Sequence, residues 1–176
     1  MKKVKVATVW LDGCSGCHMS LLDMDAAIIA LAQKIELVYG PLVDAQDFPE
    51  SVDVTLIEGA VSSQEDLSKL QKIRQRTKLL IALGDCAVTG NVPAMRNNVP
   101  VNRLLHRVYV EGSQVSKLLP TDGVPALLKQ ARPLREFVDV DLCVPGCPPP
   151  SKTILKLILD LVEGRKRESD PAMKFG

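Results

Sequence analysis

The sequence predicts an α/β fold of the flavodoxin-like kind, in which helices cover both faces of an open, mostly parallel sheet. Strand-like and helix-like segments alternate along the chain, and this order produces parallel strands. The segment 78–83 is a continuous apolar run, as is typical of a strand buried on both faces. The 176 residues, 46% of them hydrophobic, are enough for one domain with an apolar core. We expect that domain at 1–164 and a C-terminal tail at 165–176.

The first half of the chain contains three expected strands and one expected helix. Segment 3–10 alternates charged and β-branched residues before it turns apolar, which indicates a strand, and two glycines make 11–17 a tight loop. Segment 18–33 repeats apolar residues with the period of a buried helix. Segments 35–39 and 52–58 are rich in β-branched and other apolar residues and each is followed by a glycine, so both are predicted strands.

The second half continues the alternation. Segment 65–76 carries its leucines and isoleucine on one stripe, which predicts an amphipathic helix, and 78–83 is the fourth strand. Segment 85–122 is rich in Pro, Asn, Gly and Ser, so we expect only short helices there; so long a region is typically functional or partner-facing. A last strand is predicted at 138–144. A last helix follows at 152–163, with a serine before it and a glycine after it.

Composition excludes two classes of protein. The net charge is +1 and aromatic residues make up 3% of the chain, whereas nucleic-acid binders usually combine a basic face with aromatic stacking platforms. No apolar run approaches the roughly 20 residues needed to span a bilayer. The apolar stretch near the N-terminus is short and is interrupted by Asp12, unlike a signal peptide. We therefore expect a cytoplasmic protein with no membrane span and no nucleic-acid partner.

Four of the five cysteines follow predicted strands. Cys14 and Cys17 come after the first strand, Cys86 after the fourth and Cys147 after the last. Ligands of open α/β sheets collect outside the carboxyl ends of the strands, so these thiols are expected to meet at one edge. Cys143 lies within the last predicted strand and is expected in the core.

Thiols in this arrangement fit more than one kind of site. A four-iron cube needs four thiolates, and a Cys-x-x-Cys loop supplies two of them. The same motif also occurs in zinc sites and in redox-active pairs, and buried thiols are often inert. The residues alone therefore leave a [4Fe–4S] cluster, a zinc-stabilised binding module and inert cysteines as alternatives.

Four motifs resemble the small subunits of [NiFe] hydrogenases. They are WLDGCSGC at 10–17, IEGAV at 57–61, GDCA at 84–87 and PGCPP at 145–149, all in the order of that family. The segment VTGNVPAMRN at 88–97 is similar to the cytoplasmic NAD-reducing, or bidirectional, subgroup. Longer members carry a second domain with two more clusters, and periplasmic members carry a twin-arginine leader. The chain resembles a cytoplasmic version with one cluster.

This resemblance implies a function in electron transfer. Cys14, Cys17, Cys86 and Cys147 match the ligands of the proximal [4Fe–4S] cluster, which adjoins the Ni–Fe centre of a separate large subunit. Electrons would pass to flavin and iron–sulfur diaphorase subunits, so that H₂ and NAD⁺ give H⁺ and NADH. The alternative is the quinone-coupling iron–sulfur subunit of complex I, which has adjacent cysteines at the first ligand position. Here two residues separate Cys14 from Cys17, and this spacing favours hydrogenase.

Three other polar residues near the motifs have expected roles. Glu58 matches a Glu-Gly motif of the family and is expected near the cluster, as a proton relay or a charge that tunes the cluster, although a strand-end carboxylate is commonly solvated. His18 is expected at a helix start, facing solvent or a partner, and Arg96 is expected to pair with a partner carboxylate. We expect no FMN in this chain, because Cys14 and Cys17 occupy the loop that would bind its phosphate.

Overall fold

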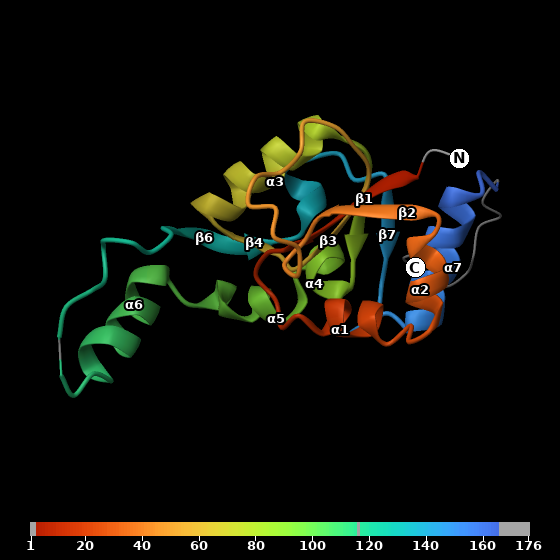
Figure 1. Ribbon diagram of the computed structural model, residues 1–176. Helices are drawn as coiled ribbons and strands as arrows, with labels where there is room; N and C mark the ends of the chain where they lie inside the picture. Colours follow the sequence, from red (N-terminus) through yellow and green to blue (C-terminus); the bar gives the residue numbers. More distant parts are fainter. Residues whose placement is uncertain (1–2, 116, 166–176) are drawn as a thin grey trace.

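The computed structural model describes residues 3–115 and 117–165 and contains a five-stranded parallel sheet (Figure 1). Its strand order is β2-β1-β3-β5-β7, with every neighbouring pair parallel. In chain order this is the 2-1-3-4-5 arrangement of flavodoxin-like folds, so the predicted fold class is confirmed. The strands are β1 (Val4–Trp10), β2 (Ile35–Tyr39), β3 (Val52–Glu58), β5 (Thr77–Leu83) and β7 (Leu142–Val144).

The register of the sheet aligns the carboxyl ends of four strands. Trp10 pairs with Glu58, Glu58 with Leu83, and Leu83 with Val144. Each of these residues is the last of its strand. The loops that leave β1, β3, β5 and β7 therefore start side by side at one edge of the sheet.

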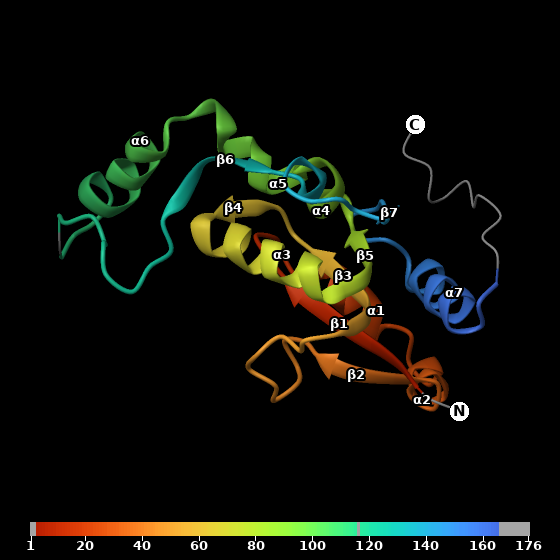
Figure 2. The same cartoon turned by 90° about the horizontal axis from the view of Figure 1, so that it is seen from above.

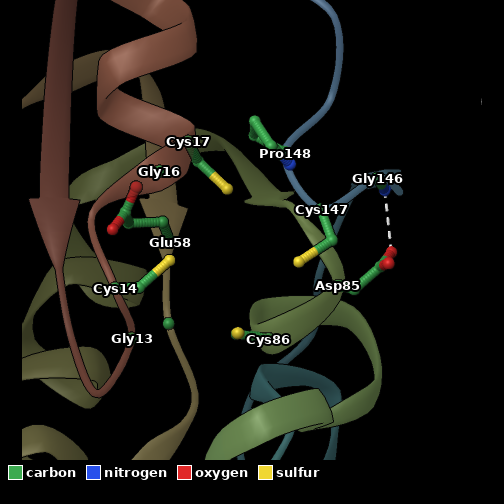
Figure 3. Close-up of a pocket in the computed structure, with 11 residues that line it drawn as sticks. Gly13, Cys14, Gly16, Cys17, Glu58, Asp85, Cys86, Gly146, Cys147 and Pro148 are labelled. Atoms are coloured by element: carbon green, nitrogen blue, oxygen red, sulfur yellow. Dashed lines mark hydrogen bonds between the residues drawn. The ribbon is translucent and has the colours of Figure 1, made fainter.

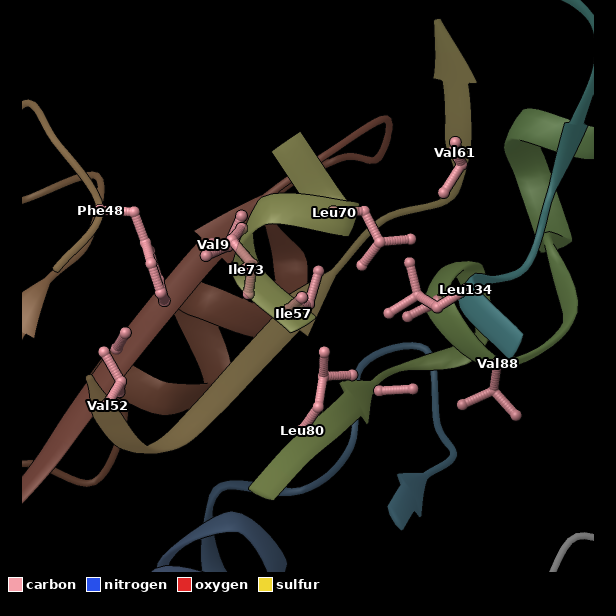
Figure 4. Close-up of a cluster of buried hydrophobic side chains, with 13 residues drawn as sticks. Val9, Phe48, Val52, Ile57, Val61, Leu70, Ile73, Leu80, Val88 and Leu134 are labelled. Atoms are coloured by element: carbon pink, nitrogen blue, oxygen red, sulfur yellow. The ribbon is translucent and has the colours of Figure 1, made fainter. Parts of the chain in front are cut away.

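One face of the sheet is covered by α3 (Gln64–Arg76) and α4 (Asp85–Thr89). Figure 4 shows Leu70 and Ile73 of α3 packed over Ile57 and Leu80 of the sheet. A capping box starts α3: Ser63 Oγ accepts from the backbone N–H of Asp66, and Asp66 accepts from the backbone N–H of Ser63. Cys143 packs against this core, as expected.

The other face is covered by α1 (Gly16–Leu22), α2 (Ala27–Ala32) and α7 (Ser151–Val162), which lie opposite α3 in Figure 2. A second apolar core fills this side. It includes Val54, Leu56 and Ile81 from the sheet and Ile154 and Leu157 from α7. Helices on both faces explain why these strands are apolar without alternation.

A two-stranded antiparallel ribbon lies beside the main sheet and was not predicted. It pairs β4 (Val61–Ser63) with β6 (Leu127–Arg132). Between α4 and β6, the chain forms α5 (Asn91–Ala94), the 3₁₀ helix η1 (Met95–Asn98), α6 (Val101–Leu105) and the π-helical η2 (His106–Glu111). Residues 99–115 and 117–126, which we call the arm, extend away from the sheet in both views (Figures 1 and 2). Short helices were expected here.

Two predicted elements differ from the structure. The expected helix at 18–33 is divided into α1 and α2 by a turn that contains Asp25 at φ 49°, a left-handed conformation that aspartate tolerates. The expected strand at 138–144 is ordered as β7 only from Leu142. Immediately before it, Asp141 Oδ2 accepts the backbone N–H of Leu80 at 2.7 Å, so a side chain replaces a ladder carbonyl there.

The described helices include none long and apolar enough to cross a membrane. The C-terminal tail predicted at 165–176 lies outside the described residues, except for Arg165. The side chain of Arg165 contacts Asp160 and Glu163 at the end of α7.

Candidate functional site

The loops at the aligned strand ends enclose a cavity of about 70 Å³. Its lining includes four cysteines, and Figure 3 shows their sulfurs pointing toward a common space. Cys14 lies in the loop before α1 and Cys17 in the first turn of α1, while Cys86 lies in α4 and Cys147 in the loop after β7. The structure thus brings together the four thiols expected to meet.

The loop that carries Cys14 is held by the loop after β3. The backbone of Asp12 exchanges two hydrogen bonds with Ala60, at 3.1 and 2.7 Å. Gly59 has a φ of +89°, and a Cβ there would lie 2.7 Å from the carbonyl carbon of Leu11 and 2.8 Å from the carbonyl oxygen of Asp12. Only glycine allows the two loops to approach this closely.

The loops that carry Cys86 and Cys147 are joined to each other. Asp85 Oδ1 accepts the backbone N–H of Gly146 at 2.7 Å, and the backbone N–H of Asp85 donates to Gly146 at 2.9 Å (Figure 3). Gly84 donates to Val144 at 2.7 Å. These contacts hold the loops of Cys86 and Cys147 side by side.

The glycines around the cavity leave room that side chains would fill. A Cβ at Gly84, whose φ is +82°, would collide with Cys17 Sγ, and one at Gly16 would lie 3.3 Å from Cys14 Sγ. Within the described part of the chain, no three His, Cys, Asp or Glu side chains converge closely enough to hold a single metal ion. The cavity is therefore a hollow lined by four thiols, and this donor set and space fit an iron–sulfur cluster.

Two thiols of the cavity, those of Cys17 and Cys86, are difficult to ionise in the absence of a metal. Burial, followed by the nearby Glu58 carboxylate, raises the pKa of Cys17 to about 12. Burial also raises the pKa of Cys86, while a hydrogen bond from the backbone of Val92 opposes that rise. Thiolates here need a bound cation to compensate their charge.

Glu58 and His18 form a buried pair beside the cysteines. Glu58 is 3% exposed, so it is not a solvated strand-end carboxylate. Its Oε2 accepts the backbone N–H of His18 at 2.8 Å and lies 2.8 Å from His18 Nδ1. The expectation that His18 faces solvent or a partner is wrong. His18 lies in the first turn of α1 and is 5% exposed. Its ring packs edge to face against Trp10 at the end of β1, with the ring centroids 5.3 Å apart.

The hydrogen bonds of three polar side chains between Asn91 and Asn97 were not predicted from the sequence. Asn91 Nδ2 lies 3.6 Å from Cys147 Sγ and donates to it. Asn97 exchanges two hydrogen bonds with the backbone of Ala131 in β6. Arg96, which is expected to pair with a partner carboxylate, donates within the chain through Nη2 to the carbonyl oxygens of Ser62 and Leu128. These residues lie in a segment without periodicity, where only the resemblance at 88–97 indicated a function.

The fold and the four convergent thiols define a class of redox subunit. Residues 14–161 match the family model described as NADH ubiquinone oxidoreductase, 20 Kd subunit. The match covers most of the chain and includes all four cysteines of the cavity. The chain belongs to this family.

Within the family, the chain is similar to hydrogenase subunits. It is 38% identical to the NAD-reducing hydrogenase HoxS subunit delta of Cupriavidus necator, over 93% of this chain and 80% of that protein. It is 37% identical, over 93% of this chain, to a subunit of the F420-non-reducing hydrogenase vhu of Methanocaldococcus jannaschii, but spans only 57% of that relative's length. A chain in the crystal structure of an NAD⁺-reducing [NiFe]-hydrogenase in the H₂-reduced state superposes with a TM-score of 0.92 at 36% identity, over 99% of both chains. The predicted resemblance to hydrogenase small subunits is confirmed.

Proposed function

We propose that this chain is the electron-transfer small subunit of a cytoplasmic, NAD-reducing [NiFe] hydrogenase. In this proposal Cys14, Cys17, Cys86 and Cys147 bind one [4Fe–4S] cluster. The observation that carries the proposal is the hollow at the sheet edge, which four thiols from three separate loops surround. The match in fold and length to a chain of an NAD⁺-reducing hydrogenase supports the enzyme class.

The residues around the cavity define what this chain contributes. A bound cluster supplies one-electron transfer at potentials set by charge, exposure and hydrogen bonds to sulfur. The four cysteines hold it, the glycines leave it room, and the Asp85–Gly146 contacts keep two of its loops together. H₂ is split at the Ni–Fe site of a partner large subunit, and electrons continue to diaphorase subunits and NAD⁺.

The partner surface is expected on the ligand loops and residues 85–122. Large apolar side chains are exposed along this part of the chain, and such patches mark interaction sites. Met95, the first residue of η1, is 74% exposed, and Val108 on the arm is 60% exposed. A large subunit seated there would exclude water from the cavity.

Cysteine replacement tests the proposed ligation. Cys86→Ser should strongly lower the iron and sulfide bound per chain, because a cube held by three thiolates is less stable. The matched control is Cys143→Ala, which removes the fifth thiol from the α3 core without touching the cavity. Equal iron content in both variants would reject the ligand set, and zinc in place of iron would support the binding-module alternative.

Glu58 is proposed as a proton relay or as a charge that tunes the cluster. It lines the cavity and is buried with His18. We expect Glu58→Gln to keep its iron while H₂ oxidation slows. Glu36→Gln removes the same charge from the exposed strand β2 and is the matched control. Wild-type turnover in Glu58→Gln would exclude the relay.

The final acceptor distinguishes hydrogenase from the complex I alternative. The native complex, purified without oxygen, should reduce NAD⁺ when supplied with H₂. Quinone reduction by NADH without any response to H₂ would support the alternative instead. All five cysteines are free in the described chain, which suits the reducing cytoplasm.

A further inference from the structure

Residues 90–98 link the thiol cavity to the β4–β6 ribbon. At the start of this segment, Asn91 Nδ2 donates to Cys147 Sγ over 3.6 Å. At its end, the side chains of Arg96 and Asn97 bind the ribbon. One end of the segment therefore donates an N–H to a cysteine sulfur. The other end is fixed to the ribbon by Arg96 and Asn97, which we call the anchors.

The anchors bind both strands of the ribbon. Asn97 Nδ2 donates to the carbonyl oxygen of Ala131 at 2.8 Å, and Asn97 Oδ1 accepts the backbone N–H of Ala131 at 2.8 Å. This side chain pairs with β6 as another strand would. Arg96 Nη2 donates at 3.1 Å to both Ser62 in β4 and Leu128 in β6. Because Ala131 is buried, loss of its partner would leave polar groups unsatisfied.

The segment depends on these anchors for its position. It consists of α5 and η1, each only four residues long, and helical turns this short are not stable alone. It begins at Gly90 with φ 90° and Asn91 with φ 29°, a bend outside the ordinary helical region. The contacts of the anchors with the ribbon therefore determine where the N–H donor of Asn91 lies.

We propose that Arg96 and Asn97 are positioning residues, which hold the N–H donor of Asn91 against the sulfur of Cys147 and so raise the reduction potential of the cluster. The inference rests on the proposed [4Fe–4S] ligation. Reduction adds negative charge to the cluster and its sulfurs. N–H donors stabilise that state more than the oxidised one, so their loss lowers the potential.

The test is a redox titration followed by electron paramagnetic resonance, on the full chain in its native complex purified without oxygen. Asn97→Ala should shift the midpoint potential to more negative values while iron content stays the same. Asn98→Ala, an exposed neighbour on the same 3₁₀ turn, should leave the potential unchanged. Asn91→Leu should shift it in the same direction, and the double variant with Asn97→Ala should shift it by less than the sum, because both act on one donor.

An unchanged potential in Asn97→Ala, or strictly additive shifts in the double variant, would overturn the inference. If Asn97→Ala binds no iron, Arg96→Lys decides: it keeps the charge but loses the shared contact with two carbonyls, so a negative shift supports the inference and an unchanged potential overturns it. Iron and sulfide in the unaltered chain are measured separately. Their absence would refute the proposed function itself, whereas a loaded chain with unshifted variants would refute only the role of the anchors.

Discussion

Gly84 is the single residue between the end of β5 and the start of α4, the helix that carries Cys86. Its φ of +82° is strained for any other residue, and a Cβ there would collide with Cys17 Sγ. We predict that Gly84→Ala lowers iron binding sharply, because Cys17 must move away from the cavity. Iron and sulfide content per chain is the measurement.

Gly123→Ala separates this collision from backbone strain. Gly123 also has a positive φ, +73°, but beyond its chain neighbours no heavy atom of the described residues lies within 4 Å of the place that a Cβ would take. An alanine at either positive φ is strained by roughly 1–3 kcal/mol, and Gly84 lies at φ 82° and ψ 163°. Iron loss in Gly123→Ala equal to that in Gly84→Ala would show that strain, and not the contact with Cys17, is responsible.

The thiol of Cys17 makes the stability of the metal-free chain depend on pH. Its pKa is raised from 9.0 to about 12 in the folded chain, so the unfolded chain loses this proton first. The stabilising contribution is complete below pH 9.0 and is lost as pH rises toward about 12. Denaturant unfolding at about pH 8 and about pH 10.5 measures how much free energy of unfolding is lost between the two pH values. This loss should be smaller for Cys17→Ser than for the unaltered chain. Equal losses would contradict the prediction.

At the scale of elements, Asp85 connects α4 to the loop after β7. Its carboxylate accepts the backbone N–H of Gly146 at 2.7 Å. Asp85→Ala should reduce stability by about 1–3 kcal/mol, since it leaves that N–H without a charged acceptor, and should reduce iron binding by freeing the Cys147 loop. Asp85→Asn keeps an acceptor oxygen and is the matched control. Calorimetry and iron analysis of the two variants check the prediction, which fails if they behave alike.

The convergence of the cysteines could be predicted from sequence because it follows from the sheet. Parallel strands present their carboxyl ends at one edge, so the position of a cysteine relative to its strand is sufficient. Cys14, Cys86 and Cys147 each come within four residues of the end of a strand. The fold class could also be predicted, because hydrophobic periodicity and the glycines at element ends indicate the alternation of strands and helices.

The missed features depend on pairing between distant segments. The three residues of β4 and the six of β6 are short and lie far apart in sequence, so no local pattern marks their pairing. Asn97 reaches β6 across 34 residues, and His18 pairs with Glu58 across 40. A single histidine after a cysteine carries no signal of burial, because burial here is decided by how α1 packs beneath the sheet edge.

Across the whole molecule, the arm lies toward one end and α2 toward the other. The arm extends from α5 and returns through β6, whereas α2 packs beside β2 and α7 (Figures 1 and 2). Both ends expose large apolar side chains: Met95 is 74% exposed in η1 and Ile29 is 70% exposed in α2. If the large subunit covers the cavity, only the first of these surfaces lies in the contact.

Met95→Asp and Ile29→Asp therefore test the direction of assembly with one matched change. A carboxylate at Met95 would be buried without a partner in the proposed contact, so Met95→Asp should weaken assembly with the large subunit at least tenfold, or about 1.4 kcal/mol. Ile29→Asp makes the same change at a similarly exposed site and should assemble normally. Co-purification and sedimentation of the complex measure both. Normal assembly of Met95→Asp together with loss in Ile29→Asp would place the large subunit on α2, where it could not shield the four thiols from water.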